Sequence, residues 1–344
     1  MHKLDVLIAG STGYIGIQLV KLLLKHPNIN IKYLCGNSSV GKNISNYDNS
    51  IKKKLPLISK FEKSKLKDCD IIFTALPSGE AQEISKFLLK KNTLIDLSGD
   101  FRLKDSKSYS KWYKQKHKAI HKIKKSIYLL PELNNISINK YQIISCPGCY
   151  PTSILLPLIP LIKNKMIRLD NIIIDSKSGY SGAGRSVYQK NTNKNLYESL
   201  SAYGVGFHKH NSEIEQEMKN FIKGEFKVIF TPHLTPMFRG ILSTIYVDLK
   251  KNVNHNKIIT LLKKFYKNKN FIKVMKKNHL LSTNDVINTN NCHISVCKTK
   301  YKNKLIILSV IDNLIKGGSG QAIQNMNQKF KFKETEGLLW KIFY

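Results

Sequence analysis

Cys149 lies in the stretch Ser145–Ser153, SCPGCYPTS, where one apolar run ends in a tight turn and a second apolar run begins. If the second run is a helix, Thr152 or Ser153 caps it, and Cys149 then lies beside the positive end of the helix dipole. A thiol in that position is biased toward the thiolate. Pro147–Gly148 forces a sharp bend, which exposes a nucleophile and supplies N–H donors for an oxyanion. The stretch therefore predicts a nucleophilic cysteine at a strand-to-helix turn.

Cys146 and Cys149 also have the C-x-x-C spacing of a redox pair or of half a zinc site. Zinc needs a second pair of ligands, but Cys292 and Cys297 are separated by four residues inside a strand-like run, and no His-x3-His accompanies them. We therefore expect no metal site. A dithiol redox role is disfavoured because the chain offers other catalytic groups that such a role would not use.

The composition favours a two-domain protein of the cytoplasm. The 344 residues exceed one typical core, and 42% of them are hydrophobic. No apolar run is long enough to span a bilayer, and the chain opens directly with a strand, so we expect neither a transmembrane helix nor a signal peptide. Six unevenly spaced cysteines favour reduced thiols in a cytosol.

The formal net charge of +34 is typical of nucleic-acid-binding proteins. The lysines, however, are scattered through every segment, and no arginine-rich or aromatic-interleaved patch is present, so we expect no specific nucleic-acid partner. Because arginine grips carboxylates and phosphates better than lysine does, each of the few arginines is a candidate for a geometric role: Arg102, Arg168, Arg185 and Arg239.

The N-terminal region has the pattern of a dinucleotide-binding unit. A strand at Leu4–Ala9 precedes GSTGYIG, an amphipathic helix follows, and Ile31–Leu34 is the second strand. The G-x-x-G-x-x-G spacing is a variant of the fingerprint in which a turn and a helix N-terminus cradle a pyrophosphate. The predicted cofactor residues here are Gly10, Ser11, Thr12, Gly13, Tyr14, Ile15 and Gly16.

The end of the second strand indicates which dinucleotide binds. Instead of the acidic residue that holds the ribose of NAD, the chain has Ser38, Ser39 and Lys42, which favour the 2′-phosphate of NADP; a solvated polar loop is the alternative. Two later strands end in turns at Pro77–Gly79 and Ser98–Asp100. Because ligands bind at the carboxyl ends of such strands, we expect both turns, through Pro77 and Ser98, to line the cofactor cleft.

After Cys149 the strand-like runs have few helices among them, which is typical of an α+β domain with a mostly antiparallel sheet. The predicted fold is thus α/β, with a Rossmann domain at 1–148 and 313–344 and a substrate and oligomerisation domain at 149–312.

Three polar clusters of the second half supply further groups that could take part in catalysis or substrate binding. Ser178–Arg185, SGYSGAGR, is suited to wrapping an anionic group; His208–Glu213 enters a helix; Pro232–Gly240 carries Arg239. With a thiolate and an NADP site, these groups suggest that a thiol attacks an acyl phosphate, phosphate leaves, and hydride reduces the thioester to an aldehyde. Histidine has a pKa suited to the proton transfers.

Seven motifs occur in one order over nearly the whole chain: GSTGYIG, LSGDFR, PGCYPT, SGYSGAGR, SAYGVG with HKHNSEIEQ, TPHLTPMFRG and KGGSGQAIQNMN. In these motifs and their order the chain resembles the N-acetyl-gamma-glutamyl-phosphate reductase family, which makes arginine precursors with NADPH. The resemblance implies a homotetramer or homodimer.

The resemblance also implies residue roles. Cys149 would form the thioacyl intermediate, and His210, in preference to His208, would be the acid/base. Arg185 and Arg239 would grip the carboxylate or phosphate of the substrate, and the residues implied for the cofactor are Gly10 to Gly16, Ser38, Pro77, Asn313 and Lys316. The other residues expected at the substrate are Arg102, Ser181, Gly182 and Glu213.

Three positions depart from the family pattern: Ser78, where histidine is frequent, Cys146, where asparagine is common, and Leu129, where glycine is usual. Cys146 offers Cys149 a partner for oxidative inactivation. Aspartate-semialdehyde dehydrogenase, with the same fold and cysteine chemistry, lacks the C-Y-P-T continuation. A reductase of the amino-adipyl homologue stays open, because one methylene is worth only about 1–3 kcal/mol in a pocket.

Overall fold

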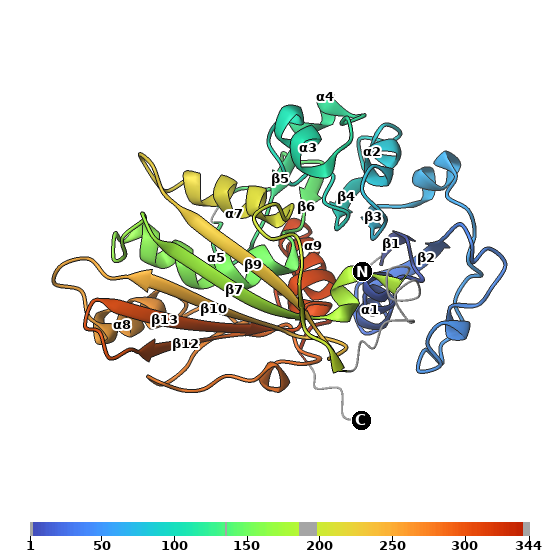
Figure 1. Cartoon of the computed structure of the whole chain (residues 1–344). Helices are drawn as coiled ribbons and strands as arrows, with labels where there is room; N and C mark the ends of the chain where they lie inside the picture. Colours follow the sequence, from blue (N-terminus) through green and yellow to red (C-terminus); the bar gives the residue numbers. More distant parts are fainter. Residues whose placement is uncertain (1–2, 135, 186–197, 340–344) are drawn as a thin grey trace. The chain divides into compact units, whose positions relative to one another are not determined.

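The computed structural model describes residues 3–134, 136–185 and 198–339 (Figure 1). The chain divides into two compact units: the described residues up to Pro147 together with the segment from Gly318, and Gly148–Gly317. The sequence predicts the divisions after residues 148 and 312, so the second division lies five residues further along the chain than expected.

The first unit is built on a six-stranded parallel sheet with the order β2-β1-β3-β4-β6-β5. The central strands are buried almost throughout, as in other parallel sheets that helices cover on both faces. The strand order reverses between β1 and β3, which is where sheets of this kind bind ligands at their carboxyl ends. The strands are β1 (Leu4–Ala9), β2 (Ile29–Cys35), β3 (Ile71–Thr74), β4 (Thr93–Asp96), β5 (Ser126–Tyr128) and β6 (Ile143–Ser145).

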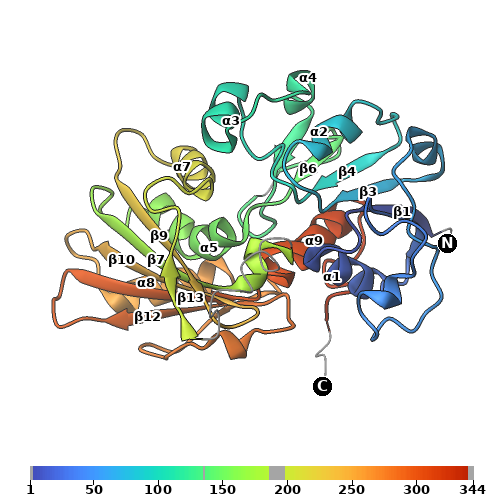
Figure 2. The same ribbon diagram turned by 45° about the vertical axis from the view of Figure 1, so that its right-hand side comes forward.

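Helices cover the two faces of this sheet. On one face, α1 (Tyr14–Leu23) and α9 (Gly320–Lys329) lie side by side (Figure 2). On the other, α2 (Glu80–Ser85) packs its apolar residues into a cluster with side chains of β1, β3 and β4. Two more helices, α3 (Ser106–Tyr113) and α4 (Ile120–Ile123), lie between β4 and β5 in the chain.

The second unit has a seven-stranded mixed sheet with the order β11-β12-β13-β10-β7-β9-β8. Only β7 with β9 and β11 with β12 are parallel, so the expected mostly antiparallel sheet is present. The strands are β7 (Ile172–Gly179), β8 (Ser201–Ala202), β9 (Val228–Thr235), β10 (Ile241–Asp248), β11 (Ile272–Val274), β12 (Cys292–Lys298) and β13 (Lys304–Ile311).

Three helices of this unit pack together on one face of the sheet: α5 (Cys149–Lys163), α7 (His210–Lys219) and α8 (His255–Phe265). None of the helices in the described parts of the chain is long and apolar enough to cross a membrane. The helix α5 is buried over nearly its whole length and therefore forms the centre of the unit's core.

The start of α5 differs from the sequence prediction. Gly148 is the N-cap residue and Cys149 is the first helical residue, whereas Thr152 and Ser153 lie inside the helix. The Thr152 hydroxyl donates to the Gly148 carbonyl at 3.0 Å. The predicted cap was therefore wrong, because Pro151 lacks an N–H and is tolerated in the first turn, which lets the helix begin earlier.

Candidate active site

The glycine turn after β1 has the close contacts of a dinucleotide-binding loop. Gly10 has φ +84°, and a Cβ there would lie 2.3 Å from the Ala75 carbonyl oxygen. A Cβ on Gly16 would lie 2.1 Å from the Gly10 carbonyl oxygen, so α1 packs directly on the turn. Gly13, in contrast, has only that same oxygen within 4 Å of a built Cβ, at 3.6 Å. The turn therefore leaves space at the N-terminus of α1, where a pyrophosphate would approach.

A cavity of about 170 Å³ lies at the carboxyl ends of β1, β2 and β3. Its lining is mainly apolar and includes Gly10, Gly36, Phe61, Leu76, Ile84 and Phe87. Glu80 and Glu83 also line it. The place and the lining fit the adenosine part of a nicotinamide dinucleotide, which Rossmann folds hold beside the end of the second strand.

The three residues predicted to select NADP differ in accessibility. Ser38 and Lys42 are exposed just after β2. Ser39 is 1% exposed, and its hydroxyl oxygen lies 2.5 Å from the position that a Cβ on Gly36 would take. The hydroxyl of Ser39 is therefore turned into the protein, which leaves Ser38 and Lys42 as the accessible members of the set.

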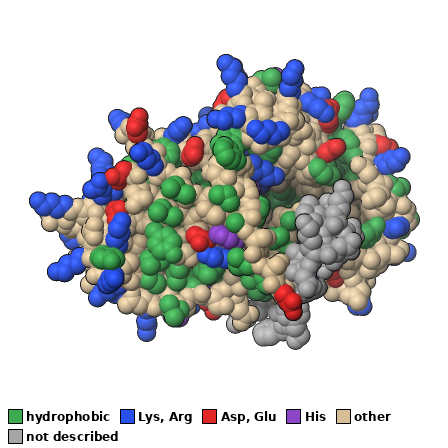
Figure 3. Space-filling view, viewed as in Figure 1, with side chains coloured by type: hydrophobic (Ala, Val, Ile, Leu, Met, Phe, Trp, Pro, Cys, Tyr) green, Lys and Arg blue, Asp and Glu red, His purple; other side chains and the backbone are tan. Residues whose placement is uncertain are grey.

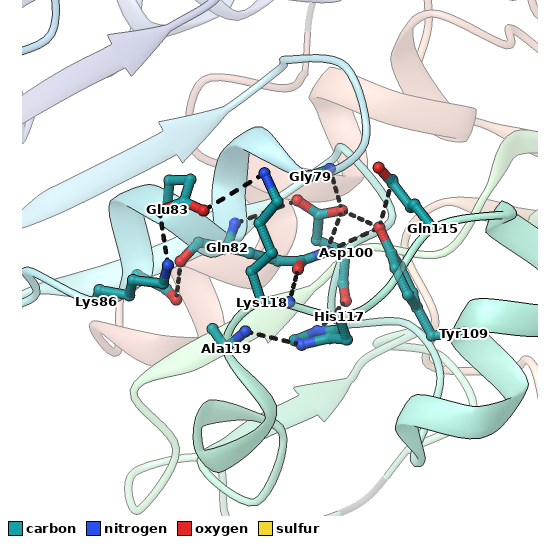
Figure 4. Close-up of polar contacts among 11 residues, drawn as sticks. Gly79, Gln82, Glu83, Lys86, Asp100, Tyr109, Gln115, His117, Lys118 and Ala119 are labelled. Carbon is teal, nitrogen blue, oxygen red and sulfur yellow. Dashed lines mark hydrogen bonds and ion pairs between the residues drawn. The ribbon is translucent and has the colours of Figure 1, made fainter.

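The turns after β3 and β4 are fastened to each other (Figure 4). The carboxylate of Asp100, which is 1% exposed, accepts hydrogen bonds from the Gly79 N–H at 2.7 Å, the Gln82 N–H at 3.2 Å and the Tyr109 hydroxyl at 2.8 Å. The Ser78 hydroxyl donates to the Ser98 carbonyl at 3.2 Å. Pro77 and Ser98, both predicted to line the cofactor cleft, thus belong to one braced pair of turns.

Arg102 contacts backbone atoms of the first unit. The side chain is 7% exposed, and it donates to the carbonyl of Cys146 at 2.8 Å and to that of Leu97 at 3.2 Å. These bonds join the end of β4 to the turn that leads to Cys149. The expectation that Arg102 binds substrate, which rests on the scarcity of arginine in the chain, gains no support from these backbone contacts.

Cys149 is half-buried and packed closely against another glycine of its unit. A Cβ on Gly317 would lie 2.6 Å from the Cβ of Cys149 and 3.1 Å from its Cα. Gly317 belongs to a π-helical turn, Ile315–Ser319, and π-turns are frequent at functional sites. The backbone of Gly317 thus supports the cysteine from one side.

His210 lies against the residue that precedes the cysteine. A Cβ on Gly148 would lie 2.4 Å from Nε2 of His210, so the ring lies directly over the Gly148 backbone. Glu213 is 0% exposed and joins the same pair, because its Oε2 accepts the Gly148 N–H at 2.9 Å and its Oε1 lies 3.7 Å from Nε2 of His210. The expectation that Glu213 binds substrate is not supported by this placement, which holds the carboxylate inside the protein.

His208 lies in an aromatic cluster beside His210. Its ring makes edge contacts with Tyr150, Tyr203, Phe230 and His210, with centroid distances of 4.7–5.8 Å. Burial, with a contribution from Lys209, lowers the pKa of His208 to about 4. Its Nδ1 accepts the backbone N–H of His210 at 3.1 Å. His208 is therefore a neutral acceptor at neutral pH that fixes the start of α7.

The predicted anion-binding residues lie around Phe238–Gly240 and the turn Tyr180–Ala183. The Ser181 N–H donates to the Phe238 carbonyl at 3.0 Å, and Gly182 follows it in the turn. Arg239 pairs with Asp312, with 3.2 Å between its Nη1 and Oδ2. Arg185 is half-buried at the edge of the described residues.

Asn313 and Lys316, expected at the cofactor, lie buried in the second unit. Asn313 is 2% exposed, accepts the Gly240 N–H at 2.7 Å and donates to Ser181 Oγ at 3.0 Å. Lys316 is 0% exposed, with its ammonium 5.6 Å from the centroid of the Phe271 ring. Both side chains are thus engaged inside their unit, and their assignment to the cofactor rests on the resemblance alone.

Cys146 is a poor attacking thiol. It is 1% exposed, burial raises its pKa to about 12, and its Sγ lies 3.5 Å from the Asn325 amide nitrogen that donates to it. Within the described ranges, no group of three or more His, Cys, Asp or Glu side chains could hold a metal ion.

Sequence reasoning did not single out Asp100 and Asp312, and it assigned Glu213 to the substrate without noting its contact with His210. A signal was present for Glu213, because it lies three residues after His210 and hence on the same side of a helix. No local pattern showed that Asp100 bonds the backbone of Gly79 and Gln82, or that Asp312 pairs with Arg239, because these partners lie 18 to 73 residues away.

Two family profiles together match most of the chain. Residues 5–141 match the "Semialdehyde dehydrogenase, NAD binding domain" and residues 149–313 match the "Semialdehyde dehydrogenase, dimerisation domain". The two matched ranges correspond to the parallel-sheet unit and the mixed-sheet unit described above.

Solved structures have the same fold at low sequence identity. An aspartate semialdehyde dehydrogenase II from Vibrio cholerae is 15% identical, with a TM-score of 0.73 over 96% of this chain and 99% of that one. A Candida albicans aspartate semialdehyde dehydrogenase determined with NADP is 17% identical, with a TM-score of 0.68 over 96% and 98% of the two chains.

The relatives that match at higher sequence identity are N-acetyl-gamma-glutamyl-phosphate reductases. The N-acetyl-gamma-glutamyl-phosphate reductases of Clostridium novyi and Vesicomyosocius okutanii are each 46% identical over 96% of this chain and 96% of their own. A probable chloroplastic one of Arabidopsis thaliana is 40% identical over 96% of this chain and 83% of its own. With identity at this level along nearly its whole length, the chain belongs to the N-acetyl-gamma-glutamyl-phosphate reductase family.

Proposed function

We propose that this chain reduces N-acetyl-gamma-glutamyl phosphate with NADPH to N-acetylglutamate 5-semialdehyde and inorganic phosphate, a step of arginine biosynthesis. The observation that carries the proposal is the contact of His210 with Gly148, the residue before Cys149 at the start of α5. A thiol at a helix N-terminus beside a histidine is the arrangement of an activated cysteine nucleophile.

In the first half-reaction, the sulfur of Cys149 attacks the acyl carbon, and the bond from that carbon to the phosphate oxygen breaks. His210 takes the thiol proton and passes it to the leaving phosphate. The products are a thioester on Cys149 and inorganic phosphate. The N–H groups of Cys149 and Tyr150, in the first turn of α5, would supply donors for the oxyanion that forms on the way.

In the second half-reaction, bound NADPH would supply the hydride that reduces the thioester carbon. The resulting thiohemiacetal would collapse with cleavage of its carbon–sulfur bond, which releases the aldehyde and the thiolate of Cys149. His210, which gave its first proton to phosphate, would take up a second proton from solvent and pass it to this thiolate. Glu213 acts as a positioning residue, because its carboxylate holds the Gly148 N–H and lies beside the His210 ring. It would also stabilise the protonated ring electrostatically.

We infer NADP as the cofactor in preference to NAD from the accessible Ser38 and Lys42 after β2, where no acidic residue follows the strand directly. Lys42→Glu should weaken NADPH binding more than NADH binding, as measured by quenching of cofactor fluorescence. Equal effects on the two cofactors would contradict this selectivity.

The assay that tests the function runs the reaction in reverse, because acyl phosphates are labile. N-acetylglutamate 5-semialdehyde, NADP and phosphate are mixed with reduced enzyme, and NADPH formation is followed. Aspartate semialdehyde and the adipyl homologue are run in parallel. We expect that NADP is reduced with the first aldehyde alone and that this reduction requires phosphate. If no NADPH forms with any of the three aldehydes, the proposal is refuted.

We also infer that two copies of the chain pair through the open face of the mixed sheet. The strand register places one row of outward side chains across β9, β7, β10 and β13, and a second row beside it. The first row is Ile229, Ile173, Tyr246 and Ile306, of which the first three are 59%, 38% and 42% exposed; the second is Thr231, Asp175, Thr244 and Leu308.

These two rows hold no lysine, although the chain has 57 Lys and Arg residues. In Figure 3, hydrophobic side chains gather over these strands while lysines surround them. Self-association of a chain of net charge +34 costs least where its cations are absent, and the matching profile describes this region as a dimerisation domain.

The measurement of this pairing is the mass in solution by sedimentation or light scattering. We expect at least a dimer for the parent, and a monomer for Ile229→Lys, with Phe207→Lys as a control that adds the same charge at another exposed apolar position, 86% exposed. An unchanged mass for Ile229→Lys would place the interface elsewhere.

A further inference from the structure

The segment Asp312–Gly317, directly after β13, contacts three parts of the second unit that carry predicted substrate-site residues. The resemblance assigns this segment to the cofactor through Asn313 and Lys316. The contacts of the Asp312 carboxylate, the Asn313 amide and the Gly317 backbone give it a different role. The inference rests on the proposed acyl-phosphate chemistry.

The carboxylate of Asp312 is 0% exposed and uses both oxygens. Oδ1 accepts the N–H groups of Leu314 and Ile315, at 2.9 and 3.2 Å, which fixes the turn of its own segment. Oδ2 accepts the Asn288 N–H at 2.8 Å and Nη1 of Arg239 at 3.2 Å. One buried charge thus holds both the turn and the arginine predicted to bind the substrate anion.

Arg239 is further fixed by Asn288. The Asn288 side-chain oxygen accepts from the same Nη1 at 2.5 Å, and the guanidinium carbon lies 5.5 Å from the centroid of the Phe238 ring. The arginine is therefore held in one direction by a carboxylate, an amide oxygen and an aromatic face.

Asn313 connects the two loops that carry the predicted anion-binding residues. Its Oδ1 accepts the N–H of Gly240, the residue after Arg239, and its Nδ2 donates to Oγ of Ser181. Gly240 has φ +106°, a backbone conformation that favours glycine. The turn at this glycine directs its N–H toward Asn313. A single side chain therefore sets the separation of the Ser181 and Arg239 loops.

Gly317 completes the arrangement at the nucleophile. Its N–H donates to the Asp312 carbonyl at 2.9 Å, which closes the π-helical turn, and its Cα lies against the Cβ of Cys149. The same six residues therefore contact the nucleophile, the Arg239 loop and the Ser181 loop.

We propose that Asp312 and Asn313 are positioning residues for the acyl-phosphate side of the site, which set Arg239 and the Ser181 loop at a fixed distance from Cys149. Small displacements matter here, because an error of about 1 Å in placing a reacting group costs on the order of 100-fold in rate. The ligand class served is a dianionic acyl phosphate, which Arg239 would bind beside the Ser181 loop.

The test compares Asn313→Ala and Asp312→Asn with Asn254→Ala. Asn254 caps α8 through a bond to the Lys257 N–H at 3.0 Å, so its removal deletes a similar side-chain bond in the same unit away from the segment. The readouts are KM for the semialdehyde and for phosphate, the dissociation constant for NADPH, and the rate at which iodoacetamide alkylates Cys149.

We expect Asn313→Ala to raise KM for phosphate or semialdehyde at least about tenfold while changing NADPH affinity by less than about twofold, because it releases only substrate-side loops. Asp312→Asn should have the same pattern and also change the alkylation rate of Cys149. The Asn254→Ala control should change none of these. If Asp312→Asn does not fold, Asn313→Ala decides alone.

A tenfold loss of NADPH affinity in Asn313→Ala, with both KM values unchanged, would overturn the inference and return the segment to the cofactor. A failure of the proposed function is distinguishable, because the parent would then turn over no aldehyde. In that case, alkylation of Cys149 in Asp312→Asn at the rate of the parent would overturn the positioning role.

Discussion

The contact between His210 and Gly148 makes one substitution especially informative. In Gly148→Ala, the new Cβ would lie 2.4, 2.7 and 2.8 Å from Nε2, Cε1 and Cδ2 of His210. Ordinary contacts begin at 3.4 Å, so the ring has to retreat by roughly 1 Å. Gly148 has φ −65° and ψ 158°, which alanine adopts freely, so the effect comes from the ring and not from backbone strain.

A displacement of about 1 Å costs on the order of 100-fold in rate, or about 2.7 kcal/mol of transition-state stabilisation. We therefore expect kcat/KM in the reverse assay to fall about 100-fold, with NADPH affinity unchanged. Loss of the glycine N-cap costs about 0.5–1 kcal/mol of stability, which a thermal melt would record separately.

The control is a double-mutant cycle with His210→Ala. Removing the ring makes room for the new methyl group, so Gly148→Ala should cost less than about threefold in that background. A full 100-fold loss in the His210→Ala background would refute the argument that the ring mediates the effect. So would wild-type activity for Gly148→Ala alone.

Four further outcomes are expected. Cys149→Ser should abolish turnover and leave NADPH binding intact; activity above a trace would exclude Cys149 as the nucleophile. Asp100→Asn should weaken NADPH binding several-fold and retain kcat at saturating cofactor, because an amide cannot accept all the N–H bonds that brace the turns after β3 and β4. An unchanged NADPH affinity would show that these bonds do not support the cofactor site. Glu213→Gln should lower kcat about tenfold or more, with Asp170→Asn, an exposed carboxylate, as control; equal activity would deny it a positioning role. Burial holds the pKa of His208 near 4, below 6.5 in the unfolded chain, so protonation favours unfolding and stability falls as pH drops from about 6.5 toward 4. His208→Asn should lose less unfolding free energy than the parent between pH 7 and pH 5, as measured by urea titration.

The sequence was sufficient for the elements whose signal is local. The glycine turn predicted β1, α1 and β2 because close helix–strand packing requires glycine at Gly10 and Gly16, and the structure has both contacts. The turn that carries Cys149 was predicted in the same way, since Pro147, Gly148 and the apolar run after them define a strand-to-helix turn without reference to the rest of the chain.

Local reasoning failed where the partner is distant in sequence. Arg102 was expected to bind substrate because arginine is rare in this chain, yet its guanidinium bonds the carbonyl of Cys146, 44 residues away. Asn313 bonds Gly240 and Ser181, 73 and 132 residues away. The sequence around such residues does not show whether the side chain will bond a backbone atom or a ligand. Only the folded structure distinguishes these two outcomes.

Three buried carboxylates have the same function in different parts of this protein. Asp100, Glu213 and Asp312 are each at most 1% exposed, and each accepts at least one backbone N–H beside a turn while contacting a functional or neighbouring side chain. Burying a charge is costly unless it is hydrogen-bonded, and acidic residues are scarce in this chain, with 23 against 57 basic ones.

Lysine, the abundant charged residue, cannot take these positions, because an ammonium donates and the turn N–H groups need acceptors. An asparagine or glutamine of the same shape would have one NH₂ group facing a donor. The surface charge of the chain can therefore drift toward lysine without disturbing the site, whereas each of these three carboxylates is fixed by the backbone geometry that it completes.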